Sequence, residues 1–235
     1  MPLTFMVAIL ILTVKVYFEL GNQLFKRSVL VVEDEDFLRS LLASTLETAG
    51  FSVSTASNAL DAKQLIKTLD PDALIVDIHL GPGPNGFDIA VAARKLTPEV
   101  ALVFLTNLPD PRFAGEDPSS IPKNVAYLNK NLLEDNQTLL DALESALTDN
   151  KRSVYRHDLL EDRPFANLSR TQVQILQLMA QGLSNQQIAE ARMRSLAATE
   201  SAITRTFEAL GIHNGADGNA RVEAVSKYLS IMNAQ

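Results

Sequence analysis

The 235-residue sequence contains no cysteine and no tryptophan, and it has only three histidines. The absence of cysteine excludes disulfides, thiolate metal sites and cysteine nucleophiles. It suits a reducing compartment, so we expect the protein in the cytoplasm. Hydrophobic residues make up 46% of the chain, which is enough for the buried core of a soluble globular protein.

Long hydrophobic runs are also lacking. The apolar run at the start of the chain ends at Lys15 and is shorter than the ~20 residues of a membrane-spanning helix. No basic residue precedes the run and no clear small-residue cleavage site follows it, which argues against a signal peptide. We expect residues 1–27 to be an appended apolar extension or the product of a start codon assigned too far upstream. A membrane anchor is the alternative, but we do not expect residues 1–20 to contact a membrane.

Charge is distributed unevenly along the chain. Residues 28–150 hold 8 Lys or Arg against 19 Asp or Glu, whereas residues 151–235 hold 10 against 8. An acidic module followed by a mildly basic one indicates two different kinds of partner. We expect a first domain at 28–147, a linker at 148–165 and a second domain at 166–235.

The first module alternates strand-like and helical segments. We expect strands at 28–32, 51–56, 72–78, 100–106 and 125–129, and helices at 36–49, 58–69, 86–97 and 134–147. Four prolines interrupt the stretch between Thr106 and Tyr127, so any helix there should be short. Nearly continuous apolar strands separated by helices predict an α/β fold, a doubly wound five-stranded parallel sheet covered on both faces.

Charged and polar side chains follow the expected strands of this sheet. Glu33 and Asp34 follow the first strand and Asp77 lies at the end of the third, so the three acids meet at one edge of the sheet. Their repulsion should raise the pKa of at least one of them, and Mg²⁺ would relieve it. Thr106 and Lys130 end the fourth and fifth strands. A hydroxyl and an ammonium group opposite the acids fit a phosphoryl group carried on Asp77.

These residues, in this order, resemble the receiver domain of bacterial two-component response regulators, which has a flavodoxin-like fold. The resemblance covers roughly residues 28–147 and rests on Glu33, Asp34, Asp77, Thr106, Tyr127 and Lys130. It implies that a histidine kinase phosphorylates Asp77. It also implies a Mg²⁺ site formed by Glu33, Asp34, Asp77 and the backbone carbonyl of His79. Tyr127 would turn inward when Thr106 moves to the phosphoryl group.

The second module is predicted to be a small all-α domain. Ser169 with Gln172 and Ser184 with Gln187 have the spacing of capping boxes at helix N-termini. Apolar residues recur at helical spacing through three helices, and a fourth helix is expected at about 219–230. A structural or dimerising bundle is one interpretation of this pattern.

The segment "GLSNQQIAE", followed by a polar helix and "LGI", resembles the LuxR-type helix-turn-helix domain over about residues 166–232. The resemblance implies that the helix at 196–210 enters the major groove of DNA. The expected contacts with bases and phosphates are made by Glu200, Ser201, Thr204, Arg205 and Arg221. Attraction to the DNA backbone should come mostly from Arg170, Arg192, Arg194, Arg205 and Arg221. We expect a homodimer on paired half-sites.

The leading hypothesis is a response regulator that acts as a transcription factor on promoter DNA, with no enzyme activity and no small-molecule substrate. A phosphorylation-independent regulator, or a signalling module whose helical domain binds protein rather than DNA, is the alternative. An aspartate-nucleophile phosphatase is a further rival, because Asp34 and Asp36 have the spacing of its D-x-D motif. That assignment would leave Asp77 without a role.

Overall fold

The computed structural model describes residues 26–117, 121–122, 125–148, 155–212 and 219–232. The N-terminal extension expected at 1–27 therefore lies outside the described residues, apart from Lys26 and Arg27. Among the residues that are described, none of the helices has the length and apolar character needed to cross a membrane.

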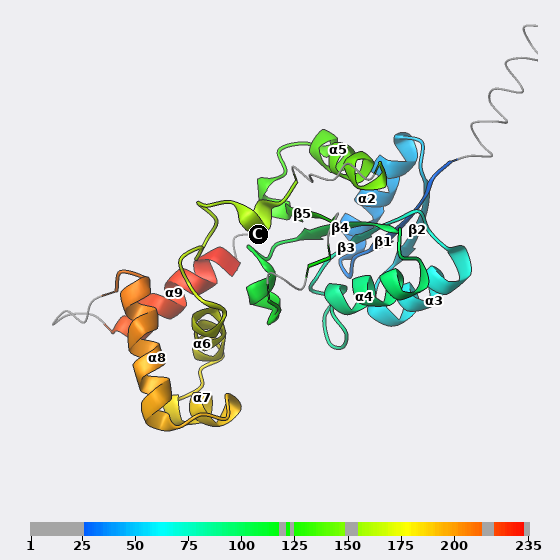
Figure 1. The fold of residues 1–235 in the computed structure, drawn as a ribbon. Helices are drawn as coiled ribbons and strands as arrows, with labels where there is room; N and C mark the ends of the chain where they lie inside the picture. Colours follow the sequence, from blue (N-terminus) through cyan, green and yellow to red (C-terminus); the bar gives the residue numbers. More distant parts are fainter. Residues whose placement is uncertain (1–25, 118–120, 123–124, 149–154, 213–218, 233–235) are drawn as a thin grey trace, which may run out of the picture.

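A five-stranded parallel sheet forms the centre of the first domain (Figure 1). Its strands are β1 (Ser28–Val32), β2 (Ser52–Ala56), β3 (Ala73–Val76), β4 (Ala101–Thr106) and β5 (Val125–Asn129). They lie in the order β2-β1-β3-β4-β5, which is the flavodoxin-like order. The chain order reverses on either side of β1, so the carboxyl ends of β1 and β3 flank a topological switch point. The expected doubly wound sheet is confirmed.

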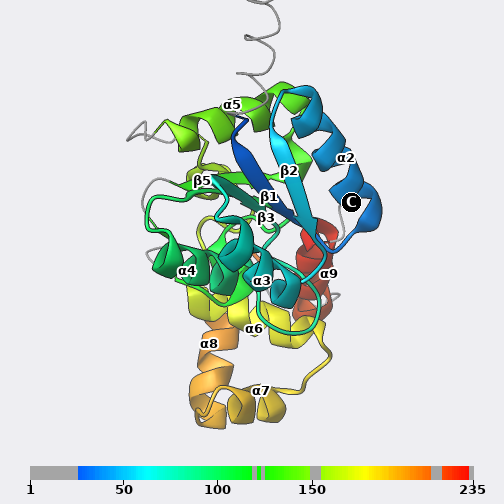
Figure 2. The same cartoon turned by 90° about the vertical axis from the view of Figure 1, so that its right-hand side faces the viewer.

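Helices cover both faces of this sheet (Figure 2). They are α2 (Asp36–Thr48), α3 (Ala59–Leu69), α4 (Gly86–Leu96) and α5 (Asn136–Leu147). Side chains alternate along each strand, because successive residues point to opposite faces of a sheet. Val29 and Val31 pack in a hydrophobic cluster with α2 and α5, whereas Leu30 and Val32 pack with α3 and α4.

The connection between β4 and β5 contains one short helix in its described part, the 3₁₀ helix η1 (Pro111–Ala114). Asp110 caps this helix, since its side chain accepts a hydrogen bond from the backbone N–H of Arg112 at 3.0 Å. Gly115 ends it with φ of 79°, a left-handed conformation that glycine adopts readily. The expectation of a short helix in this proline-interrupted stretch is confirmed.

Four helices form the second domain. They are α6 (Arg170–Ala180), α7 (Asn185–Ala191), α8 (Leu196–Ala209) and α9 (Ala220–Met232). Both expected capping boxes are present, at Ser169 with Gln172 and at Ser184 with Gln187. The expected all-α domain is therefore confirmed, together with the residues that begin its first two helices.

The helical domain packs against η1 of the first domain. The ring of Phe113 lies 6.0 Å from the ring of Phe165 and 6.2 Å from the ring of Tyr228, stacked on both. Arg112 and Asp110, beside Phe113 in the chain, form a buried ion pair with exposed side-chain fractions of 6% and 1%. Arg112 also donates to the carbonyl oxygens of Phe165 and Leu168. The two domains thus share a continuous core beside the β4–β5 connection.

The end of the linker lies along the open edge of β5. The backbone N–H of Tyr127 donates to the carbonyl of Tyr155 at 2.7 Å, and a parallel bridge joins Tyr127 to Arg156. The backbone N–H of Asn129 donates to Nδ1 of His157 at 3.1 Å. A short 3₁₀ helix, η4 (His157–Leu159), follows. The linker therefore satisfies backbone groups that an edge strand would otherwise leave exposed.

Candidate functional site: an acidic pocket and a helix-turn-helix

The strand ends bring the predicted acids together. The backbone N–H of Asp77 donates to the carbonyl of Val32 at 2.9 Å, which places the end of β3 beside the end of β1. Glu33 and Asp77 are buried, whereas Asp34 is exposed. Together with Thr106, Lys130 and Met232 of α9, these acids line a cavity of about 470 Å³. We call this cavity the acidic pocket.

Lys130 provides a positive charge inside the acidic pocket. Its Nζ atom lies 2.7 Å from Oε2 of Glu33 and 2.7 Å from Oδ2 of Asp77. Burial alone would lower the pKa of Lys130, but the charges and hydrogen bonds of Asp77 and Glu33 outweigh burial and raise it. The ammonium group therefore stays charged and holds the two carboxylates at a common point.

The pKa of Glu33 is raised, as the sequence predicted for one of the acids. The largest cause is the removal of the carboxylate from water, and the charge of Asp77 adds a smaller effect in the same direction. The hydrogen bond from Lys130 acts against both. The predicted direction is thus confirmed, but burial contributes more than repulsion between the acids.

The acidic residues also suit a divalent cation. One carboxylate oxygen from each of Glu33, Asp34 and Asp77 lies within 4.8 Å of the other two. Mg²⁺ prefers hard oxygen ligands of this kind and keeps several water molecules, so an open pocket with three carboxylates fits it. The backbone N–H of His79 donates to Oδ1 of Asp77 at 3.0 Å and orients that carboxylate. The carbonyl of His79 stays a predicted ligand.

Gly86 is a residue whose role the sequence did not reveal. A Cβ atom at this position would collide with the carbonyl oxygen of Asp77 and lie 2.8 Å from Cα of Ile78. The backbone N–H of Gly86 donates to the carbonyl of Ile78 at 3.0 Å. Only glycine lets α4 begin this close behind β3, so Gly86 fixes the backbone that carries Asp77. The available signal was a glycine at the first position of an expected helix.

Hydrogen bonds of the Leu108 backbone connect the side chains of Thr106 and Tyr127. Both side chains are completely buried. The hydroxyl of Tyr127 donates to the carbonyl of Leu108 at 3.0 Å, and the backbone N–H of Leu108 donates to Oγ1 of Thr106 at 3.4 Å. Burial raises the pKa of Tyr127 well above its usual value, so the phenol stays a hydrogen-bond donor. The aromatic ring already points inward.

The rival D-x-D arrangement is not assembled in this fold. Asp36 is the first residue of α2 and forms an ion pair with Arg39, and its side chain is 89% exposed. It does not line the acidic pocket, whereas Asp34 and Asp77 do. Asp36 is therefore not positioned in this pocket beside Asp34, as the D-x-D mechanism would need.

The predicted DNA-reading face of α8 is open to solvent. Glu200, Ser201, Thr204 and Arg205 are all exposed. The first domain contacts the helical domain through α6 and α9. Helix α8 lies on the far side of α6 (Figure 1). The contact between the domains therefore leaves this face uncovered.

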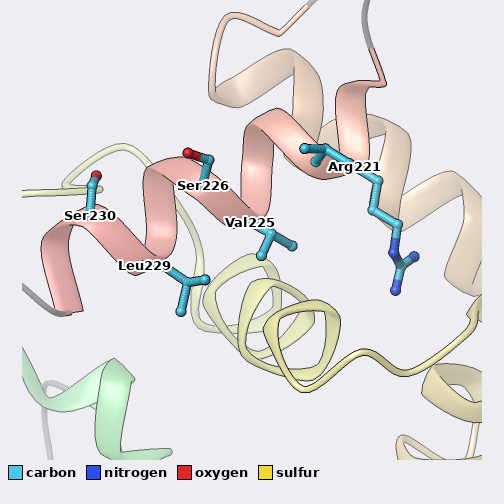
Figure 3. A pocket seen from close by; sticks show the side chains of 6 residues that line it. Arg221, Val225, Ser226, Leu229 and Ser230 are labelled. Carbon is cyan, nitrogen blue, oxygen red and sulfur yellow. The ribbon is translucent and has the colours of Figure 1, made fainter.

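Arg221 differs from the other predicted DNA-binding residues, because it is half-buried. Its guanidinium donates to Oδ1 of Asn185 at 3.0 Å and to the carbonyl oxygen of Leu183. These bonds join the start of α9 to the start of α7. Figure 3 shows the Arg221 side chain extending from α9, with Val225 and Leu229 on the same helix. A DNA contact by Arg221 stays a prediction.

Comparison with known families agrees with both halves of the structure. Residues 29–116 match the family described as response regulator receiver domain, and residues 166–217 match the luxR family of bacterial regulatory proteins. The chain therefore belongs to the bacterial response regulators and joins a receiver domain to a LuxR-type DNA-binding domain. The first match ends before β5, so it does not cover Lys130.

Individual relatives are more distant. The photosynthetic apparatus regulatory protein RegA of Cereibacter sphaeroides is 34% identical over 89 residues, which cover 38% of this chain and 46% of RegA. The match to AfsQ1 of Streptomyces coelicolor likewise spans only 34% of that protein. The oxygen regulatory protein NreC of Staphylococcus aureus is 26% identical over 171 residues, which cover 68% of this chain and 79% of NreC.

A solved structure extends the likeness to both domains. RcsB from Salmonella enterica serovar Typhimurium, bound to promoter rprA in the presence of the phosphomimetic BeF₃⁻, aligns with a TM-score of 0.53 at 18% identity. The alignment covers 86% of this chain and 99% of that one. This likeness shows a shared fold.

Proposed function

We propose that a histidine kinase phosphorylates this response regulator on Asp77 and that the phosphorylated homodimer binds promoter DNA in the cytoplasm. We assign residues 28–147 to the receiver, 148–165 to the linker and 166–235 to the DNA-binding domain. The observation that carries the proposal is the position of Lys130, 2.7 Å from both Glu33 and Asp77 at the carboxyl edge of the sheet.

Each residue of the acidic pocket has a separate part in phosphoryl transfer. A carboxylate oxygen of Asp77 forms the new bond to phosphorus as the bond to the kinase histidine breaks. Mg²⁺, held by Glu33, Asp34, Asp77 and the His79 carbonyl, would supply charge neutralisation for the transferring group. Lys130 is placed to pair with a phosphoryl oxygen, since its ammonium group already lies against Asp77. The aspartyl phosphate is then held as a signal.

Thr106 and Tyr127 carry the signal away from the acidic pocket. A phosphoryl group on Asp77 offers acceptor oxygens to the Thr106 hydroxyl. Movement of that hydroxyl breaks its bond with the Leu108 N–H, and the Leu108 carbonyl is the acceptor for Tyr127. Leu108 is followed by η1, which packs on α6. A change at Asp77 is thereby coupled to the helical domain.

The exposed face of α8 is suited to DNA. The helix enters the major groove with Glu200, Ser201 and Thr204 toward the bases, and Arg205 toward a phosphate. Glu200 can accept a hydrogen bond from cytosine N4. For the homodimer, α9 offers an apolar row in which Val222 is 63% exposed and Leu229 is 38% exposed. Two copies of the domain would place two α8 helices on paired half-sites.

The phosphorylation proposal is tested with beryllium fluoride, which mimics a phosphoryl group. We expect the full chain to bind it only with Mg²⁺, and the variant Asp77→Ala not to bind it at all. The matched control is Asp36→Ala, which removes an exposed carboxylate outside the acidic pocket and should leave binding unchanged. Binding without Mg²⁺, or binding by Asp77→Ala, would contradict the proposal.

The DNA proposal is tested with Arg205→Ala. Loss of a phosphate contact should weaken binding to all sequences alike and reduce the salt dependence of the binding constant by about one unit of slope. Lys227→Ala is the control, since Lys227 lies on α9 and pairs with Glu223. If gel-shift titrations give the same slope for Arg205→Ala and the unmodified chain, the protein-binding alternative is favoured.

A further inference from the structure

A second charged cavity lies at the junction of the two domains. It measures about 440 Å³ and is lined by four arginines, of which Arg112 belongs to the receiver and Arg170, Arg192 and Arg194 belong to the helical domain. No aspartate or glutamate is among the described residues that line it. We call it the arginine cavity. Its charge is opposite to the net charge of −7 carried by the whole chain.

Within the described part of the chain, one of these arginines has a carboxylate partner. Arg112 is neutralised by Asp110, with Nε 2.8 Å from Oδ1. Arg170, Arg192 and Arg194 form no ion pair with any residue in the described part of the chain. Three guanidinium groups with full positive charge therefore converge on one cavity.

The hydrogen bonds of the three groups are also incomplete. Arg170 donates to the carbonyl oxygen of Gly115, and Nε of Arg192 donates to Oε1 of Gln174 at 3.3 Å. A guanidinium group has five N–H donors, so most donors of Arg170 and Arg192 remain available for a ligand. Burial, and then the like charge of Arg194, lower the pKa of Arg192. The group still carries its proton at neutral pH, because arginine titrates far above it.

The receiver contributes one wall of this cavity. Arg112 and Gly115 belong to η1 and its C-terminal end, and they contact α6 and the loop before it. The exposed residues of α8 lie beyond α6 (Figure 1). The arginine cavity therefore opens at the domain junction.

We propose that the arginine cavity binds an anion through its phosphate groups. Guanidinium groups form paired hydrogen bonds with phosphate oxygens, and three of them can neutralise a doubly or triply charged anion. No aromatic side chain is among the described lining residues, so the cavity offers no surface on which a nucleobase would stack. The phosphate group itself is the feature that is recognised.

Two sources can supply this group, a small dissolved phosphate compound or the backbone of bound DNA. A dissolved anion would act independently of the function proposed above. A DNA phosphate would rest on that function and would place at this cavity the backbone attraction that the sequence predicts for Arg170, Arg192 and Arg194. Inorganic pyrophosphate represents the first source, and a DNA duplex represents the second.

The first experiment titrates pyrophosphate into the full chain and into the double variant Arg192→Gln, Arg194→Gln by calorimetry. We expect binding to the unmodified chain and at least tenfold weaker binding to the double variant. Arg205→Gln is the matched control, since it removes an exposed arginine on α8 that does not line the cavity. Arg194→Gln alone provides a second variant, because the Arg194 side chain is exposed and its backbone hydrogen bond to the carbonyl of Ala189 survives the substitution.

The second experiment measures DNA binding by the same variants. If pyrophosphate does not bind but the double variant loses tenfold or more in DNA affinity, the phosphate belongs to DNA. If neither ligand distinguishes the double variant from the unmodified chain, the proposal is wrong. Beryllium fluoride binding at Asp77 is measured in parallel and should be unchanged, so that failure of this proposal is distinguishable from failure of the phosphorylation proposal.

Discussion

The acidic pocket and the arginine cavity differ in how the charges that line them are balanced. In the acidic pocket, one lysine lies between two buried carboxylates, so part of the countercharge comes from the chain itself. In the arginine cavity, three arginines converge with no carboxylate among the described lining residues. The first pocket takes part of its countercharge from Lys130, whereas the second would take its countercharge from the anion that we propose. Burial of paired charges favours a defined geometry, and unpaired surface charges favour attraction of an outside ion.

A third cavity, a cleft of about 690 Å³ between the domains, adjoins both of them. This cleft shares His79, Leu108 and Met232 with the acidic pocket, and it shares Gly115, Gln174 and Gln177 with the arginine cavity. The two cavities therefore have neighbouring lining residues in α6, in α9 and at the two ends of η1. We expect the contrast between them to appear in three measurements, and a fourth measurement concerns the linker.

The largest effect is expected at the buried ion pair beside the arginine cavity. Asp110→Ala leaves Arg112 buried without its carboxylate and should lower the free energy of unfolding by about 3–5 kcal/mol. Chemical denaturation of the variant and the unmodified chain measures this loss in unfolding free energy. The control Asp36→Ala breaks an exposed pair and should cost at most about 1 kcal/mol. If the cavity takes phosphate groups, pyrophosphate should stabilise Asp110→Ala more than the unmodified chain. Equal losses in the two variants would contradict the assigned role of the pair.

In the acidic pocket, Lys130→Met removes the internal countercharge. Because Lys130 is 14% exposed, we expect a loss of about 2–3 kcal/mol in unfolding free energy, below the cost for a fully buried pair. Mg²⁺ should restore more stability in this variant than in the unmodified chain, since it would then be the sole cation beside the carboxylates. Denaturation with and without MgCl₂ measures this, with Lys67→Met as an exposed control. Equal effects of Mg²⁺ on both proteins would count against the metal site.

A smaller, kinetic effect is expected at Met232, through which α9 reaches the acidic pocket. Met232→Ala should widen the entrance and increase the association rate of beryllium fluoride a few-fold, while pyrophosphate binding stays unchanged. Stopped-flow measurements test it. Leu229→Ala is the control, because Leu229 lines the cleft between the domains but not the acidic pocket. An unchanged rate for Met232→Ala would show that α9 does not restrict access.

The smallest effect concerns pH and the linker. Burial lowers the pKa of His157 below its ordinary value of about 6.5, and the charge of Asp158 opposes this only in part. Between the lowered pKa of the folded state and about 6.5, the unfolded chain binds more protons than the folded chain. The free energy of unfolding therefore falls as the pH drops below about 6.5, and the contribution of His157 to stability is fully present above that pH. His157→Asn keeps an acceptor for the Asn129 N–H but does not titrate. The difference in unfolding free energy between neutral and acidic pH should therefore be smaller in the variant than in the unmodified chain. An equal difference in the two proteins would exclude His157 as a source of the pH dependence.

Much of the fold follows from local features of the chain. The apolar segments and their spacing predict the five strands to within a few residues, and Ser169 and Ser184 cap their helices as expected. The acids at the strand ends are also predictable, because parallel strands end at one edge of their sheet. The neighbours of η1 were not predictable. Nothing near Phe113 in the sequence indicates that Tyr228 lies against it.

The same distinction holds within the functional residues. Glu33, Asp34 and Asp77 were identified from their positions at strand ends, but the requirement for glycine at Gly86 appears only when β3 and α4 are brought together. The larger part played by burial in the pKa of Glu33 likewise depends on the packing around it.

The order of residues along this chain by itself determined its secondary structure, the parallel sheet and the residues of the acidic pocket, since each depends on local periodicity and on strand ends. Only the tertiary structure decided that arginines from η1, α6 and the turn before α8 share one cavity, and that the far end of α9 reaches the acidic pocket. Those contacts join residues far apart in sequence, and their free energy comes from packing and burial, which no local pattern specifies.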